Sequence, residues 1–286
     1  MFVPRKILEE RLKQILAEDI GLGDVTAAAV VPSGLTAEAA VSAKEAGTVA
    51  GVEEAVVLAE SLGLKVKVEV ADGGEVRKGQ LLLRVSGDAR AILSVERTLL
   101  NLVSRMSGIA TATRLLTEKL RKAHSKAKIA ATRKSAPGLL YFDKKAVSIG
   151  GGDPHRLNLS DMILVKDNHI ALAGSVENAV KNARQNSSFS KKIEVEVARV
   201  ADVLKTVKTG ADIIMFDNFS PKQIEEAIEL LKEAGFFGKI LLEASGEITE
   251  DNLLEYAALP VDIISMGRLT HSTKALNVSL EITKVG

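Results

Sequence analysis

The chain has 286 residues, with 38 Lys and Arg against 37 Asp and Glu, and it contains no Cys. A net charge of +1 and an aromatic content of 3% argue against a nucleic-acid-binding protein, which usually has a basic excess or aromatic faces for stacking on bases. The absence of Cys excludes disulfides, thiolate metal sites and a Cys nucleophile.

The N-terminal segment carries charges every few residues and lacks the apolar region of a signal peptide. Leu8, Leu12 and Leu16 recur at helical spacing, and Gly21 is a helix-stop residue, so this segment predicts an amphipathic helix. No apolar run approaches the roughly 18 residues of a membrane span. We therefore expect a soluble, cytoplasmic protein that binds neither membranes nor nucleic acids.

Residues 36–86 are predicted to be rich in strands, with a helix over residues 52–63. The segments 37–47 and 64–74 alternate apolar and polar residues and are followed by glycine turns. The stretch 72–87 also resembles the turn sequences of lipoyl and biotinyl carrier domains. No Lys follows a Met or Asp at a hairpin tip there, which favours an ordinary strand-and-turn segment.

Residues 89–123 predict one long helical stretch, in which Gly108 and the Ser and Thr around it mark a candidate break. We place the domain boundary at this point. The sequence thus predicts an N-terminal domain over residues 1–108, joined by the C-terminal tail 272–286, and a second domain over residues 109–271.

Beyond residue 126, short apolar segments alternate with helical segments such as 176–185 and 221–235. This alternation is typical of a parallel sheet or an α/β barrel. Six strands are recognisable, whereas a closed barrel of this type has eight. We therefore predict an open, incomplete barrel, with a doubly wound sheet as the alternative. The predicted strands are 128–134, 162–169, 192–198, 211–218, 239–246 and 261–267.

Each predicted strand ends in charged or polar residues or in glycine. The active sites of α/β barrels are built from the C-terminal ends of their strands. At any single position an ordinary loop residue is an equal alternative, but six such ends in register favour a shared site. The strand ends are Arg133-Lys134, Lys166-Asp167, Glu196, Asp217, Ser245-Gly246 and Gly267-Arg268.

Five cationic side chains at or near these ends predict a clamp for anions, because Arg matches carboxylates and phosphates in a bidentate manner and Lys acts as a point charge. A solvated basic surface is the alternative. The triple glycine at 150–152 favours the ligand, since it permits close approach of the backbone. The five cations are Arg133, Lys134, His155, Arg156 and Lys166.

The acids Glu196 and Asp217 could hold Mg²⁺ with a phosphorylated substrate or stabilise a developing positive charge. Glu194 shares a strand face with Glu196, and we expect it to form an ion pair inside the barrel. The turns that follow the fifth and sixth strands, in LLEASGEI and ISMGRLTHS, predict anion-binding sites. No P-loop, dinucleotide-binding or HExxH motif is present in the sequence.

Several long motifs, in order, resemble the quinolinate phosphoribosyltransferase family, the carboxylating nicotinate-nucleotide pyrophosphorylases. They are GDVT (23–26), ERTLLNLVSRMSGIAT (96–111), ATRKSAPGLLYFDKKAVSIGGGDPHRLNLSDMILVKDNH (131–169), IEVEV, IIMFDN, LEASGEI and VDIISMGRLTHS. The resemblance covers nearly the whole chain. It implies an N-terminal α/β sandwich domain followed by an open TIM-like α/β barrel. It also implies a homodimer or higher even oligomer in which one subunit completes the active site of the other.

The resemblance further implies a role for each residue that matches a family motif. The two carboxylates of quinolinate would be bound by Arg133, His155, Arg156 and Lys166. Arg97 of the neighbouring subunit would complete this set. Lys134, Glu196 and Asp217 would be catalytic, and the two acids would face the ribose and Mg²⁺ of phosphoribosyl pyrophosphate. Leu140 and Glu247 depart from the residues common in the family. The expected substrate-binding residues are Arg97, Arg133, Lys134, Ser135, His155, Arg156, Lys166, Glu196, Asp217, Ser245, Gly246, Glu247, Met266, Gly267 and Arg268.

The implied reaction converts quinolinate and phosphoribosyl pyrophosphate to nicotinate mononucleotide, pyrophosphate and CO₂, a step of de novo NAD biosynthesis. Two other functions stay open at this point. One is a nicotinate phosphoribosyltransferase, which performs no decarboxylation. The other is a non-catalytic carrier or binding module, for which the stretch 72–87 is the only indication.

Overall fold

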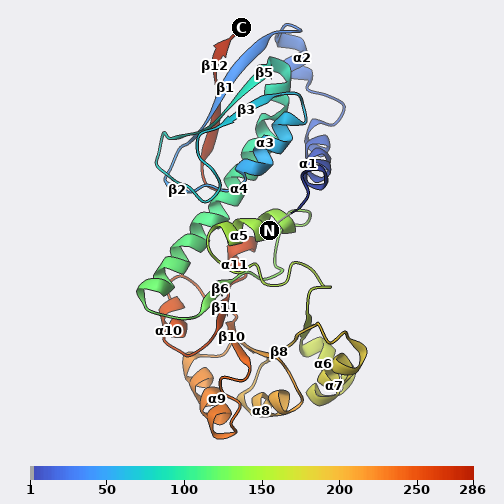
Figure 1. Cartoon of the computed structure of the whole chain (residues 1–286), viewed down its shortest axis with the longest axis vertical. Coiled ribbons are helices and arrows are strands. Elements are labelled where there is room, and N and C mark those ends of the chain that lie inside the picture. The colour runs from blue at the N-terminus through green and yellow to red at the C-terminus, as the bar shows by residue number, and fades with distance from the viewer. Residues whose placement is uncertain (1–2) are drawn as a thin grey trace. The chain divides into compact units, whose positions relative to one another are not determined.

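The computed structural model describes residues 3–286, which divide into two compact units. Unit 1 comprises the chain up to Arg114 together with Tyr141–Gly151 and Thr273–Gly286. Unit 2 comprises Leu115–Leu140 and Gly152–Ser272. Figure 1 traces the elements of both in chain order. No helix within residues 3–286 is both long and apolar enough to span a membrane.

Unit 1 contains an antiparallel sheet in the order β12-β1-β5-β3. The inner face of β1 is apolar because every second residue from Ala37 to Ala43 is buried. The stretch that resembles carrier domains supplies β4 and most of β5, so it forms part of this unit's framework. The strands of unit 1 are β1 (Thr36–Ala43), β2 (Gly47–Thr48), β3 (Lys65–Val68), β4 (Glu75–Val76), β5 (Leu81–Asp88) and β12 (Val278–Val285).

The helices of unit 1 pack with this sheet as an α/β sandwich, and side chains such as Leu83, Ile92 and Leu99 are fully buried in its core. The predicted N-terminal helix is confirmed, with a buried stripe and an end at Gly21. The predicted helix after residue 52 is confirmed as well. The helices are α1 (Arg5–Ile20), α2 (Val25–Val30), α3 (Val52–Glu60), α4 (Ala89–Lys122) and α5 (Leu140–Ile149), of which α4 continues into unit 2.

The predicted break at Gly108 is wrong, because α4 runs without interruption from Ala89 to Lys122. A Cβ atom on Gly108 would lie 2.1 Å from the carbonyl oxygen of Lys274 and 2.9 Å from Cα of Ala275. Next to this contact the backbone N–H of Leu276 donates to the carbonyl oxygen of Ser104 at 2.9 Å. The glycine therefore allows the segment that leads to β12 to pass directly against the helix.

Unit 2 contains six strands, all paired in parallel in the order β6-β11-β10-β9-β8-β7. All six strands predicted from the sequence are confirmed. The register places Glu196 and Glu243 beside Met215, and Ser245 beside Asp217. The strands are β6 (Lys128–Ala130), β7 (Ile163–Val165), β8 (Ile193–Val197), β9 (Ile213–Asp217), β10 (Leu241–Ser245) and β11 (Ile263–Ser265).

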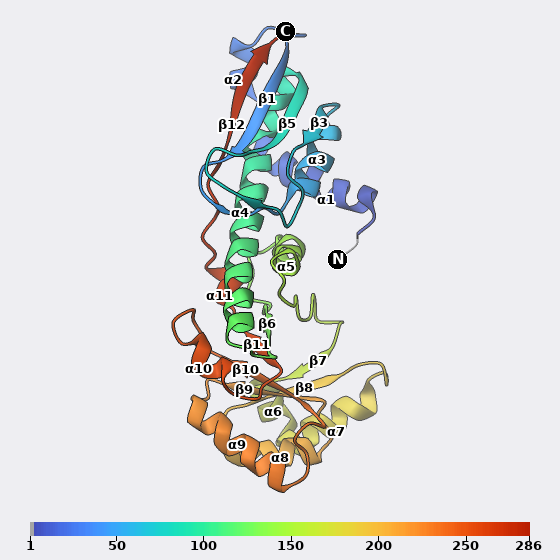
Figure 2. The same ribbon diagram turned by 60° about the vertical axis from the view of Figure 1, so that its left-hand side comes forward.

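The strand order identifies the sheet as an open barrel rather than a doubly wound sheet. From β7 to β11 the strands neighbour one another in chain order without the reversal that a doubly wound sheet requires. The first strand, β6, pairs with the last, β11, so the barrel is open between β6 and β7. Figure 2 shows α8 and α9 together on one face of this sheet. The helices of unit 2 are α6 (Asp167–Ala173), α7 (Val176–Asn186), α8 (Val200–Lys208), α9 (Pro221–Glu233), α10 (Leu253–Ala257) and α11 (Arg268–His271).

The close contact at Gly108 predicts that Gly108→Ala destabilises the protein. In an unobstructed helix this substitution stabilises by about 1 kcal/mol, whereas a forced overlap in a packed interior costs roughly 1–3 kcal/mol. Thermal unfolding should show a lower Tm for Gly108→Ala and little change for Asn101→Ala, an exposed position on the same helix. A raised Tm for Gly108→Ala would contradict the packing described above.

Candidate active site

A cavity of about 930 Å³ lies at the C-terminal ends of the parallel strands, and all of its lining residues belong to unit 2. The structure brings most of the residues predicted from the sequence together in this cavity. Those that line it are Arg133, Lys134, His155, Arg156, Lys166, Glu196, Asp217, Ser245, Gly246, Glu247, Gly267 and Arg268.

Three predicted residues do not line the cavity. Met266 is 1% exposed, and its backbone N–H donates to the carbonyl oxygen of Ala130 at 2.9 Å, so it joins β11 to β6. Ser135 follows the lining residue Lys134 and is half-buried. Arg97 lies on α4 in unit 1, with an exposed side chain. Their proposed roles in substrate binding stay predictions.

The cations of the cavity follow β6 (Arg133, Lys134), lie in the loop before β7 (His155, Arg156), or stand at the end of β7 (Lys166) and the start of α11 (Arg268). The carbonyl oxygen of Lys134 accepts a hydrogen bond from Thr270 Oγ1 at 2.6 Å, and a Cβ on Gly267 would lie 3.0 Å from Cδ of Lys134. Burial and the neighbouring charge of Arg133 lower the pKa of the Arg156 guanidinium. Two guanidinium groups close enough to repel each other create a strongly positive wall, which favours an anionic ligand.

The two predicted catalytic acids stand at the ends of β8 and β9. Glu196 forms an ion pair with Lys166, and Asp217 Oδ2 accepts a hydrogen bond from the side-chain amide of Asn218 at 3.0 Å. Within residues 3–286, no group of three metal-ligating side chains within 4.8 Å includes either acid. Two carboxylates without a third protein ligand fit Mg²⁺, which retains water and substrate phosphates as its remaining ligands.

The turns after β10 and β11 are held by contacts between strand ends. A Cβ on Gly246, whose φ is +122°, would lie 2.3 Å from Oδ1 of Asn218, so only glycine fits here. The same Asn218 oxygen accepts a hydrogen bond from the backbone N–H of Glu247 at 3.2 Å, and Ser265 Oγ donates to Ser245 Oγ at 2.9 Å. Asn218 lines the cavity but was missed from the sequence, although an Asn directly after a strand-end Asp is a typical residue for the left-handed conformation that it adopts, with φ 56°.

Gly150, the first residue of the triple glycine, packs closely against α4. A Cβ on Gly150 would lie 2.6 Å from the carbonyl oxygen of Ala110 and 2.6 Å from Cβ of Thr113, both on α4 in unit 1. None of the three glycines lines the cavity. The prediction of close backbone approach to a ligand is therefore wrong for Gly150, which instead allows close packing against a helix.

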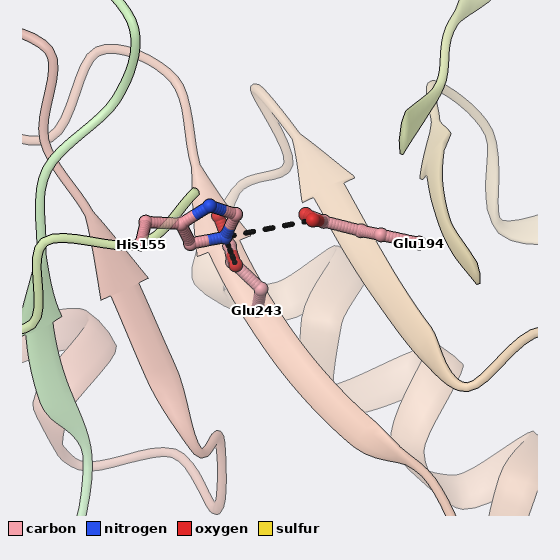
Figure 3. A group of neighbouring side chains, drawn as sticks. All are labelled: His155, Glu194 and Glu243. Carbon is pink, nitrogen blue, oxygen red and sulfur yellow. Dashed lines mark hydrogen bonds and ion pairs between the residues drawn. The ribbon is translucent and has the colours of Figure 1, made fainter. Parts of the chain in front are cut away.

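His155 stands beside two fully buried acids, Glu194 on β8 and Glu243 on β10 (Figure 3). Its Nε2 atom lies 3.1 Å from Glu243 Oε2 and 3.5 Å from Glu194 Oε2, so the structure places an imidazole within ion-pairing distance of Glu194 inside the barrel. Burial and the charge of Glu243 raise the pKa of Glu194 to about 8. Glu243 was missed from the sequence, although an acid among the apolar residues of the strand LLEAS is itself a signal of a buried charge.

An open parallel barrel whose strand ends carry clustered cations and acids defines an enzyme that acts on small anionic substrates. Two family models match the chain, the N-terminal domain of quinolinate phosphoribosyl transferase over residues 24–107 and its C-terminal domain over residues 109–281. The chain belongs to the quinolinate phosphoribosyltransferase family, as the sequence motifs predicted.

Individual relatives agree with this assignment over nearly their whole length. A probable carboxylating nicotinate-nucleotide pyrophosphorylase of Methanocaldococcus jannaschii is 45% identical over 277 residues, which cover 96% of each chain. One from Bacillus subtilis is 38% identical over 96% of this chain and 93% of its own. The solved structure of nicotinate-nucleotide pyrophosphorylase from Francisella tularensis has a TM-score of 0.89 and 33% identity, covering 99% of this chain and 98% of that chain.

The raised pKa of Glu194 predicts a pH-dependent contribution to stability. The folded state keeps this carboxyl protonated up to about pH 8, whereas the unfolded state releases the proton near its ordinary pKa of about 4.3. Folding therefore loses stability from this group as the pH rises between these two values. The neighbouring charges that face it are Glu243, which raises the pKa, and His155, Arg156 and Lys166, which lower it.

Glu194→Gln removes this titration while preserving the shape of the side chain. Denaturant unfolding of both proteins from pH 5 to pH 8 should show the free energy of unfolding of wild type falling relative to that of the variant. A constant difference between the two proteins across this range would contradict the raised pKa.

Proposed function

We propose that this protein condenses quinolinate with phosphoribosyl pyrophosphate and releases pyrophosphate and CO₂, leaving nicotinate mononucleotide. The observation that carries the proposal is one cavity that combines a wall of cations with two strand-end acids. This activity, predicted from the sequence, agrees with the names of the curated relatives. The reaction belongs to the de novo biosynthesis of NAD.

The cationic wall suits a pyridine with two adjacent carboxylates. Each carboxylate accepts hydrogen bonds only, so it requires donors, and a desolvated dianion requires several positive charges. Arg133, Arg156 and Lys166 provide guanidinium and ammonium donors, and His155 provides an imidazole. Nicotinate, with a single carboxylate, would leave part of this wall without an anionic partner.

The two acids are suited to the transfer step. The pyridine nitrogen attacks C1 of the ribose while the bond from C1 to the pyrophosphate oxygen breaks, and positive charge develops on the ribose. Glu196 and Asp217 offer carboxylates that stabilise this charge, and Lys134 offers a cation for the departing pyrophosphate. Mg²⁺, held through Glu196 and Asp217 together with the substrate phosphates, would neutralise further pyrophosphate charge.

Decarboxylation follows from the product of this transfer. Once the ring nitrogen is bonded to ribose it is cationic, and it stabilises the electron pair left on the neighbouring ring carbon when the carbon–carbon bond to CO₂ breaks. That carbon then takes a proton from water. The protein need supply no general base, which suits a cavity whose ionisable groups are mainly cations and ion-paired acids.

We include in the proposal an assembly of two or more copies in which Arg97 reaches the cavity of a neighbouring subunit, and a location in the cytoplasm. The exposed position of Arg97 in unit 1, outside the cavity-lining set, supports the shared site. The multiple charges of both substrates support a cytoplasmic location, because such molecules do not cross a lipid bilayer unaided.

The reaction is tested by incubating the purified protein with phosphoribosyl pyrophosphate, Mg²⁺ and either quinolinate or nicotinate. Release of CO₂ and formation of nicotinate mononucleotide from quinolinate are expected. Turnover of nicotinate alone would instead identify a nicotinate phosphoribosyltransferase. No turnover, with a mass increase on a Lys within residues 72–87, would identify a carrier module.

If Arg133 and Arg156 bind the carboxylates of quinolinate, Arg133→Ala and Arg156→Ala should each lose much of the activity on quinolinate. Hydrogen bonds to charged groups contribute about 1.5–3 kcal/mol, so each substitution should lower kcat/KM for quinolinate roughly ten- to a hundredfold. Arg199→Ala is the matched control, because Arg199 is an exposed arginine of unit 2 that pairs with Asp202 and does not line the cavity. Full activity of either clamp variant would refute its assignment.

The shared site predicts complementation between two inactive variants. Arg97→Ala and Asp217→Ala should each have little activity, because one lacks the contributed arginine and the other lacks the strand-end acid. Mixed assemblies contain one site with both residues intact and should regain part of the wild-type rate. Mixed assemblies that are shown by differential tagging to form, yet remain inactive, would rule out the contribution of Arg97 across subunits.

A further inference from the structure

The backbone at His155 is held in an unusual conformation by several hydrogen bonds. Its φ of 53° lies in the left-handed region, which is unfavourable for a residue other than glycine. Its N–H donates to Asp153 Oδ1 at 2.7 Å. Asp153 is in turn bonded to β6, through its N–H to Ile129 and through its carbonyl oxygen from Ala131, at 2.7 and 3.0 Å. The loop therefore presents the imidazole at a fixed place in the cavity.

The imidazole faces two buried carboxyl groups that have few other partners. Both contacts start from Nε2, and they reach Glu243 on β10 and Glu194 on β8 (Figure 3). Both acids are 0% exposed, and neither oxygen of Glu194, nor Oε1 of Glu243, has a hydrogen-bond partner. A buried carboxylate without donors is costly. The nitrogen at 3.1 Å from Glu243 is therefore the group that stabilises this acid, which it can do only by carrying a proton.

We propose that Glu243 is a positioning residue for the dicarboxylate substrate: it accepts the Nε2–H of His155 and holds the imidazole in its doubly protonated form, so that Nδ1–H donates to a substrate carboxylate. The carboxyl group of Glu194 on β8 lies on the other side of the same nitrogen, at 3.5 Å. Glu243 itself also lines the cavity, so the acid and the imidazole belong to one site.

The chemistry of both partners requires this protonation state. This step rests on the proposed function, in which the ligand is a dicarboxylate. A carboxylate on each side of the ring accepts hydrogen bonds, so a neutral imidazole, with one N–H, could satisfy only one of them. Arg156 and Lys166, which line the same cavity, oppose a charged ring, and the carboxylate of Glu243 at 3.1 Å offsets their effect.

The kinetic test uses Glu243→Gln, which keeps the size of the side chain and removes its charge. KM for quinolinate should rise roughly ten- to a hundredfold, while KM for phosphoribosyl pyrophosphate stays within about twofold of the wild-type value. Glu243→Asp, which retains the charge, should recover part of this loss. Glu54→Gln is the matched control, since Glu54 is an equally buried acid in unit 1 that pairs with Lys145, and its KM for quinolinate should not change.

The protonation state is read directly from the ¹⁵N spectrum of histidine-labelled wild-type protein. The chain has only four His residues, so the signals of His155 are assigned by comparison with His155→Asn. At pH 7 both ring nitrogens of His155 should carry protons, and in Glu243→Gln the ring should become neutral. This measurement needs no substrate, so it does not depend on the activity of any variant.

The outcomes separate this role from the proposed function. Wild-type protein that releases no CO₂ from quinolinate would contradict the function, whereas active wild type with an unchanged KM in Glu243→Gln would overturn the positioning role alone. An unprotonated Nε2 in wild type would also overturn it. The same three side chains could surround a metal ion. Stoichiometric bound transition metal that is lost in Glu243→Gln would therefore replace the hydrogen bond with coordination and overturn the proposal.

Discussion

The parallel pairing of six strands in a single direction is the constraint on which the site depends. Because every strand runs the same way, every strand delivers its last residues to the same edge. The pairing of Ser245 with Asp217, and of Glu196 with Met215, then sets which side chains are neighbours across that edge. The cavity therefore forms directly at the C-terminal edge of the sheet.

Cationic and acidic side chains are arranged together at this edge of the sheet. Cations such as Arg133 and Arg156 line the cavity, and they repel each other, so that binding of an anion between them is favourable. Acids lie among and beneath them, from Glu196 paired with Lys166 to Glu243 beside His155. A wall made only of cations would be unstable without its ligand, and a wall fully neutralised by acids would bind it weakly. The near-zero net charge of the chain conceals this local separation.

Much of the fold and the site could be predicted from the sequence. Periodicity located all six barrel strands, and the charged ends of these strands located the cavity, because both signals are local. The errors concern glycines and buried acids. Gly108 looks like a helix breaker and Gly150 like a residue for close approach of a ligand, yet each allows close packing against a segment that is distant in sequence. The role of Glu243 can be recognised only from its contact with His155. The two residues are 88 positions apart in the sequence, so only the folded chain brings them together.

The pairing of β12 with β1 has a consequence for synthesis on the ribosome. β1 begins at Thr36, but its outer neighbour in the sheet is built from Val278–Val285. The strands of unit 2 all emerge before that neighbour exists, so the barrel can close its own hydrogen bonds while the edge of β1 is still exposed. Domains usually fold from the N-terminus onwards during translation, but the sheet of unit 1 can be completed only after β12, the last strand, has been synthesised. During that interval the unpaired edge of β1 is open to chaperones and to mispairing with other chains.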